Sequence, residues 1–168
     1  MTSQDSPLRI AELPTPIGGV LGMTICPGKH APTSVSGHGW ARDLVTDVAA
    51  IRAWGASSVV TLMESWELDR YAVSSIAQVV QAEGMAWFHL LIVDGRAPDS
   101  EWLREWSEHN CRKLFQRLAQ GDRVLVHCLG GRGRTGTVAA MLIMEAGVSA
   151  KDAIDRVRAI REGAVESE

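Results

Sequence analysis

The sequence has few cysteines, no excess of basic residues and no long apolar run, and each absence excludes a class of protein. Its three cysteines are too few and too scattered for a disulfide scaffold, so we expect free thiols. Seventeen Lys and Arg residues against 20 Asp and Glu residues give a net charge of −3. No overall basic field therefore exists to hold nucleic acid or an anionic membrane, although a local basic pocket is compatible with this balance.

The apolar stretches are also too short for a membrane protein. The longest, AAMLIMEAG, begins at Ala139, is interrupted by Glu145 and falls well short of a membrane span. The N-terminal residues MTSQDSPLRI lack the basic segment and the apolar stretch of a secretory signal peptide. Together with the free thiols, these absences predict a cytoplasmic protein.

Length and composition fit one globular domain. The 168 residues are 46% hydrophobic and 22% charged, which is too apolar for a disordered chain and ordinary for a folded one. Neither an internal repeat nor a linker divides the sequence. We therefore expect a single domain over residues 1–168.

Apolar periodicity alternates between strand and helix patterns along this domain. Short strands are predicted within residues 8–13 and 19–25, joined by a PTPIGG turn, and at 57–63, 86–93 and 123–127. Helices are predicted over 44–54, 71–83, 100–120 and 135–146, with one more after Ser149. The alternation indicates an α/β fold with a central, mostly parallel sheet flanked by helices.

Two of these helices have readable caps and faces. Asp99 or Ser100 caps the helix over 100–120, and Ser149 with Asp152 resembles a capping box for the last helix. The residues expected to face the core are Leu103, Cys111, Leu114, Phe115 and Leu118 in the first helix, and Ile154, Val157 and Ile160 in the second.

The most informative stretch is VLVHCLGGRGRTGTVAA, which starts at Val124. A buried strand ends at His127, Cys128 follows, and a glycine-rich turn leads into a helix that opens near Arg134. Backbone N–H groups in such a turn can converge with the helix N-terminus on a phosphate-like anion. The residues predicted to bind this phosphate are Leu129, Gly130, Gly131, Arg132, Gly133 and Arg134.

This turn also predicts catalytic chemistry. Its positive potential favours the thiolate form of Cys128, which makes the sulfur a nucleophile at neutral pH. The planar guanidinium of Arg134 can bind two phosphate oxygens at once. The hydroxyl of Thr135 can donate to the sulfur and assist its departure in a second step.

The motif His127-Cys128-x5-Arg134-Thr135-Gly136 resembles the signature loop of cysteine-dependent protein tyrosine and dual-specificity phosphatases. The resemblance covers roughly residues 8–163. Within the family, the sequence is similar in detail to the kinase-associated phosphatase branch of the dual-specificity group. The further segments that carry it are PGK at 27–29, RDL at 42–44, the strand leading to Glu64, and VDGRAPD at 93–99. It implies the three-layer fold of dual-specificity phosphatases.

The resemblance also implies roles for the site residues. Cys128 attacks phosphorus to form a phosphocysteine, and Arg134 binds the phosphoryl oxygens. An aspartate on a separate loop protonates the leaving oxygen, and Asp94 matches it; Asp99 is the alternative, with helix capping as its simpler role. His127 orients the loop and the cysteine without exchanging protons itself. Neither a metal nor an organic cofactor is implied.

Several alternatives stay open at this point. The substrate is a phosphoprotein or, because Arg132 adds a cation to the loop, a phosphoinositide or other small phosphate. A non-catalytic phosphate-binding module and a sulfurtransferase are more distant possibilities. Arg42 and Glu64 either brace the loops by ion pairing or lie on the surface, and Cys26 either packs in the core or protects Cys128 as a partner thiol.

Two nucleotide-binding hypotheses fail on the residues. Gly131, Gly133 and Gly136 fit the G-x-G-x-x-G pattern of dinucleotide-binding folds. That pattern needs a following strand with an acidic residue about 20 positions on, where this sequence predicts a helix around Asp155. The G-x-x-x-x-G-K-[ST] motif of Walker-type nucleotidases is absent from the sequence.

Overall fold

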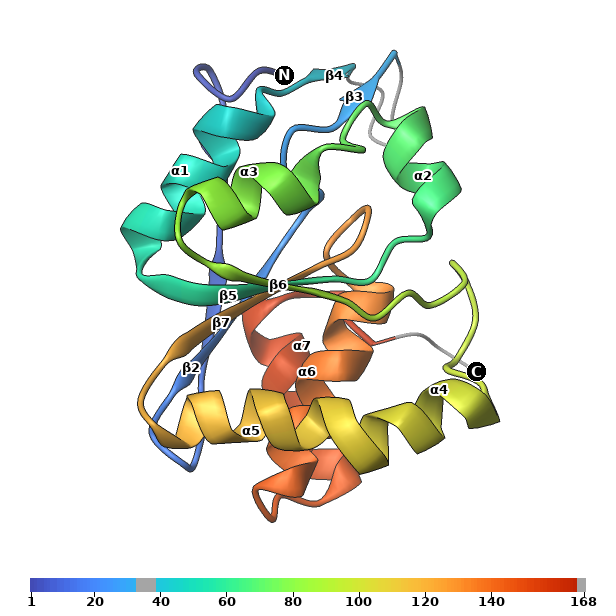
Figure 1. The fold of residues 1–168 in the computed structure, drawn as a ribbon. Coiled ribbons are helices and arrows are strands. Elements are labelled where there is room, and N and C mark those ends of the chain that lie inside the picture. The colour runs from blue at the N-terminus through green and yellow to red at the C-terminus, as the bar shows by residue number, and fades with distance from the viewer. Residues whose placement is uncertain (33–38, 166–168) are drawn as a thin grey trace.

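A five-stranded sheet forms the centre of the computed structural model, which describes residues 1–32 and 39–165 (Figure 1). Its strands, in spatial order, are β1 (Ala11–Pro14), β2 (Val20–Thr24), β7 (Arg123–His127), β5 (Ala56–Thr61) and β6 (Ala86–His89). The β1–β2 pair is antiparallel, and the other three pairings are parallel. A separate two-stranded sheet joins β3 (His30–Ala31) to β4 (Trp40–Ala41).

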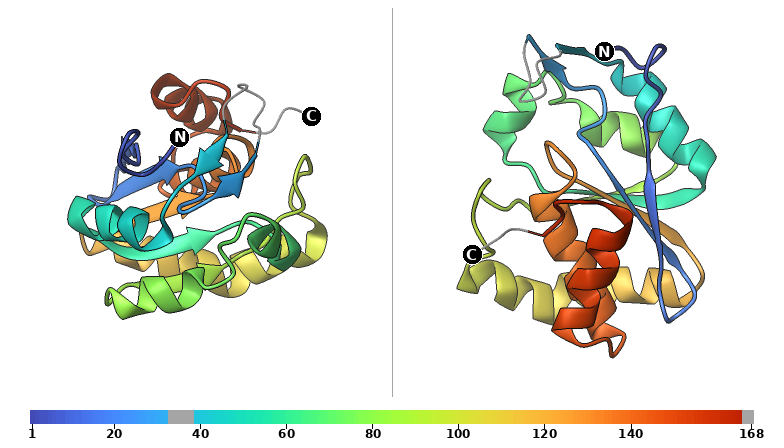
Figure 2. Two further views of the ribbon diagram at one scale, coloured as in Figure 1. Left: turned by 90° about the horizontal axis from the view of Figure 1, so that it is seen from above. Right: turned by 180° about the vertical axis from the view of Figure 1, so that it is seen from behind.

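Helices cover both faces of the central sheet. They are α1 (Leu44–Trp54), α2 (Ser65–Arg70), α3 (Ile76–Ala82), α4 (Ser100–Glu105), α5 (Cys111–Ala119), α6 (Gly133–Glu145) and α7 (Ala150–Ile160), with a π-helical turn at Trp106–Asn110 between α4 and α5. Figures 1 and 2 show α1 and α3 on one side of the sheet and α5, α6 and α7 on the other. The predicted α/β fold, a mostly parallel sheet flanked by helices in three layers, is confirmed.

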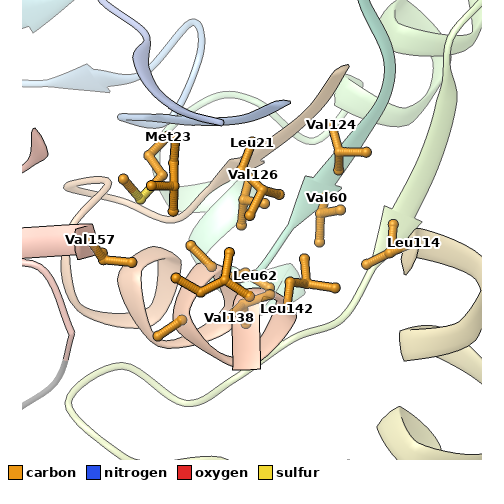
Figure 3. Packing of buried hydrophobic residues seen from close by; sticks show 14 of the residues in the cluster. Leu21, Met23, Val60, Leu62, Leu114, Val124, Val126, Val138, Leu142 and Val157 are labelled. Atoms are coloured by element: carbon orange, nitrogen blue, oxygen red, sulfur yellow. The ribbon is translucent and has the colours of Figure 1, made fainter. Parts of the chain in front are cut away.

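The two helical layers enclose separate apolar clusters because side chains alternate across the strands. On β7, Val124 and Val126 point to the cluster beneath α5, α6 and α7, whereas Leu125 points to the cluster beneath α1 and α3. On β5, Val60 likewise points to the first of these clusters and Val59 to the second. Figure 3 shows the first cluster, in which the strand valines meet side chains of the helices below. Burial on both faces explains why these strands are continuous apolar runs.

The predicted caps are present in the structure. Asp99 accepts a hydrogen bond from the Trp102 backbone N–H at 2.8 Å and begins α4. Ser149 accepts from the Asp152 N–H at 3.2 Å and begins α7. Gly55 ends α1 in the left-handed conformation, which glycine adopts without steric cost.

Two predicted segment boundaries are wrong. The helix expected over 71–83 begins only at Ile76, and the short helix α2 precedes it. A six-residue helix is too short to show periodicity, and it is held instead by a capping box between Glu64 and Glu67. The strand expected over 86–93 ends at His89, after which the chain leaves the sheet in an irregular loop.

Two residues predicted to face the core do not. Leu103 is 42% exposed, and Trp106 is buried in its place. The π-helical turn that starts at Trp106 changes the rotation per residue, so the face read from a regular helix no longer holds. Ile160, in the last turn of α7, is 37% exposed, while Val157 is fully buried as predicted.

The parallel strands bring four distant segments to one edge of the sheet. Because β2, β5, β6 and β7 run in the same direction, their carboxyl ends lie side by side. The segments that leave this edge are residues 25–29, 62–67, 90–94 and 128–132. Ligands in open α/β sheets bind at such an edge, so this is where a site is expected.

Candidate active site

The loop between β7 and α6 turns its carbonyl groups outward. The Leu129 carbonyl accepts from the Cys26 N–H at 3.1 Å. The guanidinium of Arg161, which follows α7, donates to the carbonyls of Gly131 at 2.5 Å and Gly130 at 2.8 Å. The outer side of the loop is therefore held by backbone and side-chain donors from two other segments.

The end of the loop is fixed in the same way by the C-terminal segment. The Arg132 carbonyl accepts from the N–H groups of Gly136 at 2.7 Å and Val165 at 3.1 Å. Within the described chain, the N–H groups of residues 129–132 donate to no acceptor. These free donors lie beside the N-terminus of the 13-residue helix α6, at the place where the sequence predicts that an anion binds.

Two glycines make this loop geometry possible. Gly131 has a φ of +67°, and a Cβ atom there would lie 2.3 Å from the Thr24 carbonyl oxygen. A Cβ atom at Gly136 would lie 2.4 Å from the Val165 backbone nitrogen. The loop packs directly on the backbone of β2 and of the C-terminal segment because neither glycine has a side chain.

Arg134 is buried and is held by a carboxylate that the sequence did not single out. Its Nη1 and Nη2 atoms donate to the two carboxylate oxygens of Glu67 at 2.8 and 2.9 Å, and Nη1 also donates to the Ile92 carbonyl at 3.0 Å. Burial lowers the pKa of Arg134, but the hydrogen bonds of Glu67 and the nearby charges of Cys128, Glu67 and Asp94 together raise it overall. The Nε–H is buried and has no hydrogen-bond partner among the described residues.

The two candidate acids occupy different places. The carboxylate of Asp94 lies 3.5 Å from Nη2 of Arg134, and its side chain is 61% exposed. Asp99 caps α4 instead and contacts Trp102. The structure therefore brings Asp94, and not Asp99, to the guanidinium.

His127 is held as a neutral ring beneath the loop. Its Nε2 atom lies 2.7 Å from the Thr61 hydroxyl, which accepts a hydrogen bond from the Trp87 indole at 2.8 Å. The hydroxyl can then donate its own proton to Nε2, which places the histidine proton on Nδ1, 3.3 Å from the Cys128 carbonyl oxygen. Burial lowers the pKa of His127 to about 4.

The remaining thiols and hydroxyl are buried. Cys128 is 4% exposed at the start of the loop, and Cys26 and Cys111 are buried in the core, all three with free thiols. The Thr135 hydroxyl is buried without a hydrogen-bond partner among the described residues. Over residues 1–32 and 39–165, no group of three His, Cys, Asp or Glu side chains is placed to hold a metal ion.

The same combination of fold and loop occurs in a known family. The family model described as "Swiss Army Knife protein, DSP-PTPase phosphatase domain" matches residues 39–168. The chain belongs to this phosphatase domain family. The predicted resemblance is therefore confirmed at the level of the family.

Relatives of this phosphatase domain are found among curated sequences. Cyclin-dependent kinase inhibitor 3 of Homo sapiens is 30% identical over 129 residues, which cover 75% of this chain and 59% of the relative. Protein tyrosine phosphatase type IVA 3 of Homo sapiens is 27% identical over 138 residues, covering 82% of this chain and 70% of the relative. The chain thus spans about three-fifths of the length of the cyclin-dependent kinase inhibitor 3 proteins that it matches.

Solved structures agree with these sequence matches. A kinase-associated phosphatase whose catalytic-site cysteine is substituted by serine superimposes with a TM-score of 0.82 and 26% identity, covering 96% of this chain and 89% of that one. The active form of Tk-PTP gives a TM-score of 0.67 and 28% identity, covering 94% and 88%. The similarity to the kinase-associated branch is confirmed in both sequence and structure.

Arg42 and Glu64, the two residues proposed to brace the loops, have different roles in the structure. Glu64 begins α2 as its N-cap, whereas Glu67, one turn later, is the partner of Arg134. Arg42 is buried and pairs with Asp47 at 2.8 Å. Asp47 also accepts from the Gly28 N–H, so this pair does brace the turn beside the loop. The capping-box spacing of Glu64 and Glu67 was the only local signal that could have pointed to Glu67.

Replacing Glu67 by Ala is expected to lower the free energy of unfolding by about 3–5 kcal/mol, because the buried Arg134 charge loses its counter-charge. The matched control is Glu64→Ala, which removes the N-cap of the same helix and an exposed hydrogen bond from the Trp66 indole but leaves the Arg134–Glu67 pair in place, and it is expected to cost about 1 kcal/mol. Urea unfolding at pH 7 measures both variants. Equal losses would show that Glu67 only caps α2.

His127 is expected to make stability depend on pH. Its pKa of about 4 in the folded protein lies below the ordinary value of 6.5, so the unfolded chain binds more protons between these values. The contribution of the neutral His127 ring to the free energy of unfolding is complete above pH 6.5, and it falls by about 3 kcal/mol as the pH drops to 4.

Unfolding curves collected between pH 4.5 and 7 test this dependence. The quantity to compare is the slope of the free energy of unfolding against pH, which does not depend on the absolute stability of each variant. His127→Gln should flatten the slope in this range. The matched control His109→Gln changes an exposed histidine and should retain the wild-type slope. A wild-type slope in His127→Gln would assign the dependence to other groups.

Proposed function

We propose that the protein is a phosphomonoester hydrolase of the protein tyrosine and dual-specificity class, acting through a phosphocysteine at Cys128. The observation that carries this proposal is the loop itself. Its carbonyls are bound on the outside, its N–H groups are free on the inside, and Arg134 is fixed with a free Nε–H. Such a site binds the three oxygens of a phosphoryl group beside the sulfur.

The first step transfers the phosphoryl group to sulfur. The Cys128 thiolate attacks phosphorus, the S–P bond forms and the bond to the leaving oxygen breaks. Arg134 and the N–H groups of residues 129–133 bind the equatorial oxygens, where negative charge is spread in the transition state. Asp94, beside Arg134 and open to solvent, donates its proton to the leaving oxygen.

The second step hydrolyses the phosphocysteine. Asp94, now a carboxylate, takes a proton from water as the water oxygen attacks phosphorus and the S–P bond breaks. The Thr135 hydroxyl donates to the departing sulfur, which gives a partner to a group otherwise unpaired in the described chain. His127 positions the start of the loop and moves no proton, since it is buried and its pKa is about 4.

Substrate and location belong to the same proposal. A phosphotyrosine or phosphoserine/threonine protein is the primary substrate class, in keeping with the tyrosine phosphatases among the relatives. A phosphoinositide or other small phosphate is the second candidate, favoured by the exposed Arg132 in the loop. We infer that residues 1–168 form one domain and that it binds no nucleic acid. We also infer that it acts in the cytoplasm, where free thiols persist. No helix of the described residues is long and apolar enough to cross a membrane.

Cys128→Ser is expected to abolish hydrolysis of 4-nitrophenyl phosphate, because a serine hydroxyl is not ionised at neutral pH. Binding of inorganic phosphate should remain within about threefold of wild type, since the N–H groups and Arg134 are unchanged. Steady-state kinetics and titration calorimetry measure the two quantities. Residual turnover near the wild-type rate would exclude Cys128 as the nucleophile.

Asp94→Asn is expected to slow a poor leaving group far more than a good one. The loss should approach about 10²- to 10⁴-fold with phenyl phosphate and shrink markedly with an activated aryl phosphate, whose anion leaves without a proton. The matched control Asp99→Asn removes a helix-cap carboxylate and should show no dependence on the leaving group. The opposite pattern in the two variants would make Asp99 the general acid.

A further inference from the structure

A cleft with a volume of about 820 Å³ opens beside the signature loop. Leu129, Gly130 and Arg132 form its wall on the loop side, and the N-terminal segment around Arg9 forms another wall. The chain starts beside β4, where the Ala41 N–H donates to the Met1 carbonyl (Figure 1), and the Arg9 carbonyl accepts from the Thr24 hydroxyl at the end of β2. The cleft thus shares its boundary with the loop that holds the reacting phosphate.

The charge of this cleft is strongly one-sided. Its cationic lining residues are Arg9, Lys29, Arg42, Arg132 and Arg161, and no Asp or Glu is among the described residues that line it. Only Arg42 has a carboxylate partner within salt-bridge distance in the described chain. Four uncompensated cations therefore gather around one hollow in a protein whose net charge is −3.

The excess of positive charge around the cleft includes a buried residue, Lys29. The residue is only 7% exposed, and its Nζ lies 4.2 Å from the centre of the Trp40 ring and 3.4 Å from the Leu129 carbonyl oxygen. Burial lowers the pKa of Lys29. Trp40 lines the same cleft, and its indole N–H is buried without a partner among the described residues. A cation and a donor left in this state are both relieved by an anion.

We propose that this cleft binds a second phosphate of a small polyphosphorylated substrate, such as a sugar or inositol bisphosphate, whose first phosphate occupies the 128–134 loop. The inference rests on the proposed function and, of its two substrate classes, favours the small phosphate over the phosphoprotein. Leu129 and Gly130 belong to both the loop and the cleft, so the two anions lie on one molecule of modest size. The volume is that of pockets that enclose small ligands, which favours a compact polyol over an extended peptide.

The decisive variant is Arg9→Glu, because Arg9 is exposed, lines the cleft and has no part in the catalytic loop. The matched control is Arg52→Glu, the same charge change on the exposed side of α1. Arg9→Glu should lower kcat/KM for inositol 1,4-bisphosphate by about tenfold or more, the loss expected for one charge-assisted hydrogen bond. Hydrolysis of 4-nitrophenyl phosphate should stay unchanged in both variants. Equal effects of the two variants would overturn the proposal.

Binding to Cys128→Ser protein separates this proposal from the catalytic one. Titration calorimetry with inositol 1,4-bisphosphate and with inositol 1-phosphate should show tighter binding of the bisphosphate, and Arg9→Glu should remove the difference. Lack of turnover of every aryl phosphate by the wild-type protein would refute the proposed function, while equal binding of the two compounds would refute the second subsite alone.

The source of the second phosphate is resolved by comparing three substrates at equal concentration. Preference for soluble inositol bisphosphate supports a free metabolite, and preference for vesicles of phosphatidylcholine with phosphatidylinositol bisphosphate supports a lipid headgroup. Either result sustains the proposal. A doubly phosphorylated peptide would refute the proposal under two conditions together. Its kcat/KM would have to be the highest of the three substrates, and Arg9→Glu and Arg52→Glu would have to lower that kcat/KM equally, by a loss that added salt removes.

Discussion

The buried ion pair between Arg134 and Glu67 is the constraint on which the geometry of the site depends. A guanidinium is always charged, so its burial at the base of the loop requires a carboxylate with well-aligned oxygens. Glu67 provides this from α2, which starts where β5 leaves the sheet. The pair fixes two of the guanidinium nitrogens and leaves the third free. The position of the Arg134 guanidinium thus depends on a carboxylate from a short helix.

A second layer of contacts keeps the loop open for an anion. Arg161 occupies the carbonyls of Gly130 and Gly131, and Val165 occupies the carbonyl of Arg132. With the acceptors bound from outside, only donors remain on the inner side. Arg161, which performs part of this bracing, also borders the basic cleft, so the same side chain holds the loop and contributes to the positive charge beside it.

Local signals in the sequence predicted the loop, the fold class and the helix caps well. The loop is contiguous, so Cys128 and Arg134 lie close together by chain geometry alone. The Asp99 and Ser149 caps depend on residues only three positions away. Apolar runs for the central strands and helical apolar periodicity for the longer helices were sufficient for the order of these elements along the chain.

The sequence did not show the contacts that cross the fold. Glu67 lies 67 residues before Arg134, and no local pattern joins them. Arg161 reaches back 30 residues to Gly131, and its position follows only from how α7 packs beside α6. Leu103 was misplaced for a different reason, because a π-helical turn leaves no mark in apolar periodicity. Tertiary packing decided these features.

The outward-turned carbonyls also bear on what counts as the complete folded protein. The amides of residues 129–132 donate to no acceptor in the described part of the chain. A bound anion supplies the missing acceptors in the way that a capping side chain completes a helix. By mass action, such an anion shifts the folding equilibrium toward the native state. Inorganic phosphate bound in the loop would therefore stabilise the folded protein.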